Sequence, residues 1–133
     1  RGAIVAATRA RILATARNCP ASRTNCASRY SRFPCHVGCI WSYDVFVHIG
    51  PRETEQYLAE FSRVLAPGGR GIVHHPREGG SPNGFRSNMT DKIFADMVQK
   101  NGMNVVSQIT SWGKNNEFNL EWFRDVITVF EKP

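Results

Sequence analysis

The first 39 residues of this chain contain no aspartate, glutamate or lysine. They hold seven of the 17 basic residues, all of them arginine, so this segment carries a formal charge of +7. The other 94 residues hold ten basic and all 11 acidic residues, a formal charge of −1. The excess of +6 is therefore local to one end, and the rest has the near-neutral charge of an enzyme for small molecules. On this ground we expect a small-molecule acceptor and no nucleic-acid partner.

Long apolar runs and paired cysteines are also missing. No apolar run approaches the roughly 20 residues that cross a bilayer, so we expect no membrane partner. The four cysteines all lie in the first 39 residues and do not form the two paired units typical of a zinc site. Cys35, His36 and Cys39 form one weak local cluster. We predict free thiols and no metal site, as is usual in a cytosolic protein.

The composition changes near Cys39 and divides the chain into residues 1–38 and residues 39–133. The first segment is rich in Arg, Ala, Ser and Cys, and three interpretations compete for it. It resembles an organellar transit peptide, it has the charge of a basic arm for nucleic acid or an anionic surface, or it is translated from the wrong reading frame. We favour the third. We expect a cytoplasmic location, or an organellar one if the segment is a transit peptide.

A regular apolar pattern begins at Cys39. Residues 39–49 are apolar, aromatic and β-branched, which predicts a strand of a parallel sheet, buried on both faces. Pro51 suits the first turn of a helix, where its missing N–H costs nothing. We predict that this helix is stopped by Pro-Gly-Gly at residues 67–69 and followed by a strand over residues 70–75. Strand, helix and strand have the size of a right-handed βαβ unit.

The last third predicts one more helix and a hairpin. After a polar loop over residues 76–89, Thr90 is the expected N-cap of a helix that ends at Gly102. Strands are predicted over residues 103–112 and 125–132. Because no helix separates these two strands, they should form a hairpin, with the final strand antiparallel to its neighbour.

These elements resemble a known family. Residues 61–70, Phe-Ser-Arg-Val-Leu-Ala-Pro-Gly-Gly-Arg, are similar to the RVLxPGG signature of class I S-adenosylmethionine-dependent methyltransferases. In that family the signature joins the helix after the fourth strand to the fifth strand, and residues 41–49 resemble the fourth strand. The terminal hairpin resembles the sixth strand and the antiparallel seventh. The resemblance covers about 95 residues. It implies an α/β fold with a partial Rossmann-like methyltransferase sheet, the carboxyl-terminal half of the domain.

The family's cofactor motif is not recognisable in this sequence. The family grips its cofactor with a glycine-rich loop after the first strand and an acidic residue after the second. This sequence contains no Gly-x-Gly-x-Gly, and it begins with Arg1, not Met. We expect a fragment, a processed product or an incomplete gene model that carries only the acceptor-side wall of the crevice.

Two functions from different classes follow. The resemblance implies S-adenosylmethionine as methyl donor and transfer to an oxygen or nitrogen of a small molecule, by a truncated or frame-damaged copy that is weakly active or inactive alone. The alternative is a non-enzymatic binding module with a basic amino-terminal arm for nucleic acid or an anionic surface. The sequence leaves the acceptor and the oligomeric state open.

Three candidate site residues, His48, His74 and His75, lie where the predicted strands end, and α/β enzymes place their chemistry there. His48 is the expected catalytic base, since an imidazole titrates near neutral pH. Ser42 and Asp44 are the expected cofactor-binding residues, and we place Asp44 inside the strand, where its charge needs a partner.

Substrate binding is assigned to three further residues. His74 and His75 end the next strand, and strand alternation should turn one of them toward the crevice and the other away. Arg86 is expected to clamp an acceptor carboxylate or phosphate with two parallel hydrogen bonds. Trp112 and Trp122 are expected in the core.

Overall fold

The computed structural model describes residues 36–80 and 84–133. Most of the segment 1–38, with its three interpretations, and Cys35 therefore lie outside the described residues. The elements are β1 (Val37–Ser42), α1 (Pro51–Val64), β2 (Leu65–Pro76), α2 (Asp91–Lys100), β3 (Asn104–Ile109), β4 (Ser111–Trp112), β5 (Phe118–Asn119) and β6 (Asp125–Glu131). A short 3-10 helix, Glu121–Phe123, precedes β6.

The main sheet has the strand order β1-β2-β6-β3. β1 and β2 are parallel, and β6 lies between β2 and β3 and is antiparallel to both. This confirms the βαβ unit and the antiparallel final strand. Among the described residues β1 is an edge strand, with no strand on its outer side.

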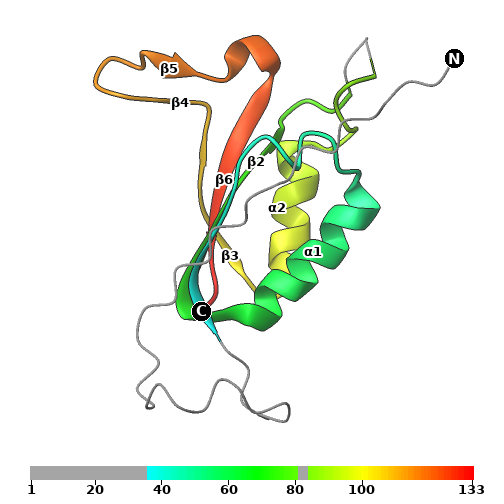
Figure 1. Ribbon diagram of the computed structural model, residues 1–133, viewed down its shortest axis with the longest axis vertical. Coiled ribbons are helices and arrows are strands. Elements are labelled where there is room, and N and C mark those ends of the chain that lie inside the picture. The colour runs from blue at the N-terminus through cyan, green and yellow to red at the C-terminus, as the bar shows by residue number, and fades with distance from the viewer. Residues whose placement is uncertain (1–35, 81–83) are drawn as a thin grey trace, which may run out of the picture.

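Both helices cover the same face of the sheet (Figure 1). The core fills the space between them: Leu58 and Phe61 of α1 and Phe94 of α2 are buried against Phe130 of β6. The Phe130 ring lies 6.4 Å from Phe61 and 6.3 Å from Phe94, centre to centre. These contacts explain the helical spacing of apolar residues in α1 and α2.

Glycine is required at one point of this core. A Cβ at Gly71 of β2 would overlap the ring of Phe130, which crosses directly over the backbone there. Because Gly71 has no side chain, the buried ring of Phe130 can lie against the backbone of β2.

The end of α1 differs from the prediction. The helix stops at Val64 because Leu65 is already extended (φ −66°, ψ 137°), and residues 67–69 belong to β2 and do not stop the helix. The Nζ of Lys132 donates hydrogen bonds to the carbonyl oxygens of Ser62 (2.7 Å) and Leu65 (3.0 Å). A lysine from the far end of the chain therefore satisfies carbonyls at the helix end, which α1 alone could not do.

The start of α2 is as predicted. Thr90 is the N-cap, and its Oγ1 accepts a hydrogen bond from the backbone N–H of Ile93 at 3.1 Å. Gly102 follows the helix with φ 73°. The strand expected over residues 103–112 is interrupted: β3 ends at Ile109, and β4 pairs with β5 in a separate hairpin. The break falls at Thr110, whose carbonyl accepts a hydrogen bond from the N–H of Leu120.

The first strand is shorter than predicted and is buried on one face only. β1 ends at Ser42, and Asp44, expected inside the strand, lies in the following turn with a left-handed backbone (φ 59°). Trp41 is 40% exposed because both helices lie on the other face. The tryptophans expected in the core are also wrong, since Trp112 is 38% and Trp122 is 87% exposed.

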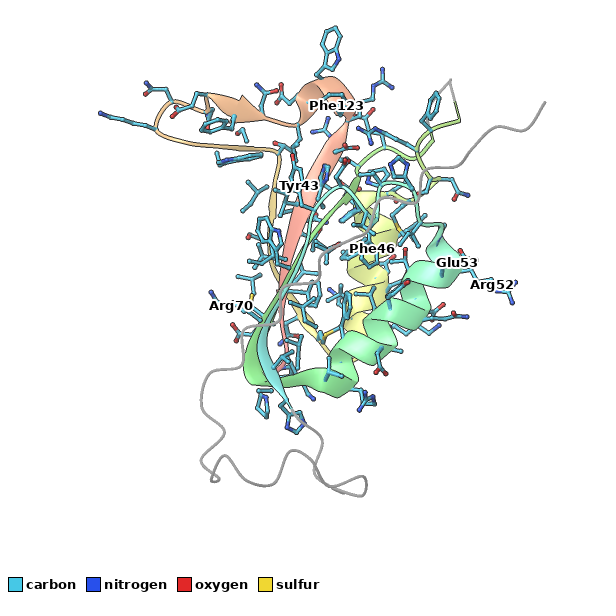
Figure 2. The ribbon with its side chains drawn as sticks, viewed as in Figure 1. Tyr43, Phe46, Arg52, Glu53, Arg70 and Phe123 are labelled. Carbon is cyan, nitrogen blue, oxygen red and sulfur yellow. The ribbon has the colours of Figure 1, made fainter. Side chains whose placement is uncertain are left out.

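The face away from the helices holds an apolar cavity of about 450 Å³. Its lining residues are Trp41, Tyr43, Ile72, Ile109, Trp112, Ile127 and Val129. Figure 2 shows Arg70 on this side of the sheet and Phe46 on the helix side.

Candidate functional site

A second cavity, here called the strand-end cavity, opens where β1 and β2 end and β6 begins. Its volume is about 610 Å³. Two of its residues, Tyr43 and Phe123, mark its place near the upper end of the sheet in Figure 2. The lining residues are Tyr43, Asp44, His48, His74, Phe85, Arg86, Leu120, Phe123 and Asp125.

Two loops form one side of the strand-end cavity and are joined by hydrogen bonds. The backbone N–H of Ser87 donates to the carbonyl of Val47 at 2.8 Å. The Nδ1 of His48 lies 2.6 Å from the carbonyl oxygen of Phe85. The loop after β1 and the loop before α2 therefore carry their side chains into the cavity as one unit.

The contact of His48 decides which of its ring nitrogens is free. A carbonyl oxygen can only accept, so Nδ1 must carry the proton and donate it to Phe85. In the neutral ring Nε2 then has the unshared electron pair. Since His48 is exposed and lines the strand-end cavity, this nitrogen is available to accept a proton from a ligand.

In His74 the two ring nitrogens have the reverse roles to those in His48. The backbone N–H of Asp44 donates to its Nδ1 at 3.1 Å, so the proton of the neutral ring sits on Nε2. Nε2 lies 3.1 Å from Oδ2 of Asp125, and the ring stacks on Tyr43 with centres 4.4 Å apart. Both nitrogens face groups of the protein and the ring is 3% exposed, so His74 has a positioning role beside the cavity.

Asp125 is a site residue that sequence reasoning missed. It opens β6 and is completely buried, with Oδ2 2.9 Å from Nη2 of Arg86 and 3.1 Å from Nε2 of His74. These short approaches are out of line for hydrogen bonds, so neither carboxylate oxygen is hydrogen-bonded within the described residues. A buried carboxylate without hydrogen bonds depends on a nearby cation for its stability, and here that cation is Arg86. The signal in the sequence was an acidic residue at the start of an otherwise apolar strand.

Arg86 comes from the loop before α2 and is fixed on two sides. Asp125 pairs with one end of its guanidinium, and the ring of Phe123 lies 5.2 Å from its Cζ. The side chain of Arg86 is 19% exposed. Because the ion pair occupies only part of the five-donor guanidinium, the remaining N–H groups are left for a ligand in the strand-end cavity.

His75 faces the helix layer, opposite to its neighbour. Its ring stacks on Phe94 at 4.0 Å, its Nδ1 lies 2.8 Å from the Pro76 carbonyl oxygen, and its Nε2 lies 2.8 Å from Oγ1 of Thr128. Burial lowers the pKa of His75 to about 4, against the opposing effect of the Pro76 hydrogen bond. The ring is therefore neutral near pH 7 and belongs to the core, remote from any substrate in the strand-end cavity.

The sequence candidates thus separate into two groups. Asp44, His48, His74 and Arg86 meet in the strand-end cavity. Ser42 and His75 do not, because their side chains are buried on the other face of the sheet. Ser42 instead lines a space of about 60 Å³ against α1.

Within residues 36–80 and 84–133, no group of three or more His, Cys, Asp or Glu side chains is placed to hold a metal ion. The helices in the same residues are too short or too polar to span a membrane.

No protein-family model and no curated protein sequence matches this chain. The fold does match solved structures, 71 chains in all. The described residues have the fold of class I S-adenosylmethionine-dependent methyltransferases, as part of a Rossmann-like sheet.

Three matches show the range of proteins with this fold. The CcbJ methyltransferase of Streptomyces caelestis has a TM-score of 0.58 at 10% identity, over 78% of this chain and 64% of its own. The magnesium protoporphyrin IX methyltransferase of Synechocystis, solved with bound SAH, has a TM-score of 0.55 at 9% identity, over 77% and 48%. The [4+2]-cyclase SpnF has a TM-score of 0.53 at 16% identity, over 78% and 53%.

These comparisons establish the fold and leave the chemistry to the site, since one of the three proteins is named a cyclase. The chain spans between about half and two thirds of the length of the three proteins.

Proposed function

We propose that this chain belongs to an S-adenosylmethionine-dependent methyltransferase that methylates an oxygen or nitrogen of a small molecule. The observation that carries the proposal is His48, which lines a cavity at the carboxyl ends of β1 and β2 and whose Nε2 has no hydrogen-bond partner among residues 36–80 and 84–133. In α/β sheets of this kind, ligands bind at that end of the strands. We take the reaction class from the methyltransferases among the solved structures with this fold, and the base from the cavity.

Two residues of the strand-end cavity, Tyr43 and Asp44, are suited to hold a methyl donor. Asp44 exposes a carboxylate at the rim of the strand-end cavity, and Tyr43 offers a half-exposed ring beside it. These two would hold polar and aromatic parts of the donor. Ser42 is turned to the helix side. Because the sequence contains no Gly-x-Gly-x-Gly, we expect this chain alone to bind the donor weakly and to have little activity.

When bound, S-adenosylmethionine supplies a methyl group activated by its sulfonium. The acceptor O–H or N–H gives its proton to Nε2 of His48, which can take it because Nδ1 is engaged by Phe85. The sulfur of the donor would be the leaving group, so the chain's own part in the reaction is to remove the acceptor proton. His74, held by Asp44 and Asp125, keeps the floor of the cavity in place.

The donor site is tested by titrating the ¹⁵N-labelled chain with S-adenosylmethionine up to millimolar concentration and recording amide shifts. We expect shifts at Tyr43 and Asp44 and not along α2. Asp44→Asn should weaken binding severalfold, while Asp96→Asn, an exposed carboxylate of α2, should not. An unchanged spectrum, or shifts confined to other surfaces, would refute the proposed donor site.

The base is tested by transfer of a labelled methyl group at high protein concentration. His48→Gln should lower the rate by at least about 10²-fold, the usual contribution of a general base. His36→Gln is the matched control, an exposed histidine ahead of β1. Equal rates for the two variants would remove His48 from the mechanism.

A further inference from the structure

The strand-end cavity is lined by a base, His48, and by a cation, Arg86. His48 is hydrogen-bonded to the carbonyl of Phe85, the residue directly before Arg86. The hydrogen bond therefore holds the imidazole next to the backbone of the segment that carries Arg86. A ligand of modest size can contact both groups at once.

The guanidinium of Arg86 is oriented before any ligand arrives. Asp125, fully buried behind it, holds Nη2 at 2.9 Å, and Phe123 covers one face. Nε2 of His74 lies 3.1 Å from the same Oδ2. Arg86 therefore does not depend on a ligand for charge balance, yet its other N–H groups remain at the cavity, in the planar arrangement that suits a carboxylate.

The rim of the cavity is aromatic. Tyr43 is 46%, Phe85 75% and Phe123 54% exposed, and all three line the strand-end cavity. Exposed rings around a polar floor suit a flat ligand that stacks or packs edge-on. A cavity of about 610 Å³ is in the range for drug-sized molecules.

We infer that the acceptor is an aromatic hydroxy acid, with its carboxylate on Arg86, its ring on Phe85 and Phe123 of the rim and its hydroxyl directed to His48. The role of the hydroxyl rests on the proposed function. The recognition of the carboxylate by Arg86 does not, because it concerns binding alone.

The test compares three probes of one shape: 4-hydroxybenzoate, its neutral methyl ester and the cationic 4-hydroxybenzylamine. Binding to the ¹⁵N-labelled full chain is followed by amide shifts. We expect the acid to bind at least about tenfold more tightly than the ester, and the amine more weakly than both. Equal affinities, a preference for the amine, or no binding of the acid at 10 mM would overturn the inference.

The variants assign the preference to Arg86. Arg86→Gln should abolish the difference between acid and ester. Because it leaves Asp125 buried without its cation, the double variant R86Q/D125N is measured beside it to keep the site neutral and folded. The control is Arg77→Gln, since Arg77 pairs with Glu78 outside the cavity. A folded double variant that still prefers the acid would refute the assignment.

The outcomes separate the two proposals. If the acid binds at Arg86 but receives no methyl group, the proposed function fails and the anion site stands. If methyl transfer to phenols occurs with no preference for the acid, the proposed function stands and this inference fails.

Discussion

His75 makes the stability of this protein depend on pH. In the folded chain its Nδ1 donates to Pro76, and Thr128 donates its hydroxyl proton to Nε2 while Gln108 donates to the Thr128 oxygen. A proton added at Nε2 would displace the Thr128 hydrogen bond and place a charge against Phe94. Burial therefore lowers the pKa of His75 to about 4 from an ordinary value of 6.5.

The direction of the effect follows from which state binds the proton. Between pH 6.5 and 4 the unfolded chain takes up a proton at His75 and the folded chain does not, so acid favours unfolding. The stabilisation is complete above pH 6.5 and is lost as the pH falls toward 4. Each pKa unit corresponds to about 1.4 kcal/mol, so the loss should be about 2 kcal/mol at pH 5 and about 3 kcal/mol below pH 4.

Urea unfolding at several pH values between 7 and 4 measures this loss as a fall in the free energy of unfolding. His75→Gln cannot titrate in this range and should remove about 2 kcal/mol of the difference between pH 7 and pH 5. A His75→Gln slope equal to that of the wild type, or an NMR titration of His75 centred near pH 6.5, would refute the reasoning.

Three further substitutions test contacts of the fold by urea unfolding at pH 7. Gly71→Ala should lower the free energy of unfolding by about 1–3 kcal/mol, because the added Cβ would overlap the Phe130 ring. The control Gly38→Ala has open space around the added Cβ and should change the free energy little. Equal effects of the two substitutions would contradict this packing. Thr90→Ala should cost about 1 kcal/mol through loss of the N-cap, and Thr90→Ser should restore it. Lys132→Met should cost about 1–2 kcal/mol by freeing two carbonyls at the end of α1, and an unchanged midpoint would show that water replaces the lysine.

Local rules in the sequence were sufficient for the main elements. Pro51 marked the start of α1, Thr90 the N-cap of α2 and Gly102 its end, because each depends on the backbone chemistry of its own residue. The absence of a helix between the last strands predicted the antiparallel β6. The resemblance to methyltransferases rested on these elements and their order, and the solved structures bear out that fold.

The sequence predicted which residues lie near the site, but not which groups of the protein they contact. Strand ends pointed to His48, His74 and Arg86, because the carboxyl ends of parallel strands meet at one edge of the sheet. Whether these residues bind a ligand stays a prediction, and so does the role of Asp44. Nothing in the spacing of the residues indicated that Asp125, 39 residues after Arg86, would be its ion-pair partner.

The composition and spacing of the residues thus specify which segments are helices and strands, since these depend on neighbours a few positions apart. Packing between distant segments specifies the rest. It left Trp41 of β1 40% exposed, placed Lys132 at the end of α1, and gave two adjacent histidines different partners. His75 is desolvated against Phe94, whereas His74 lies beside a buried carboxylate, and such differences in surroundings arise only when the chain has folded.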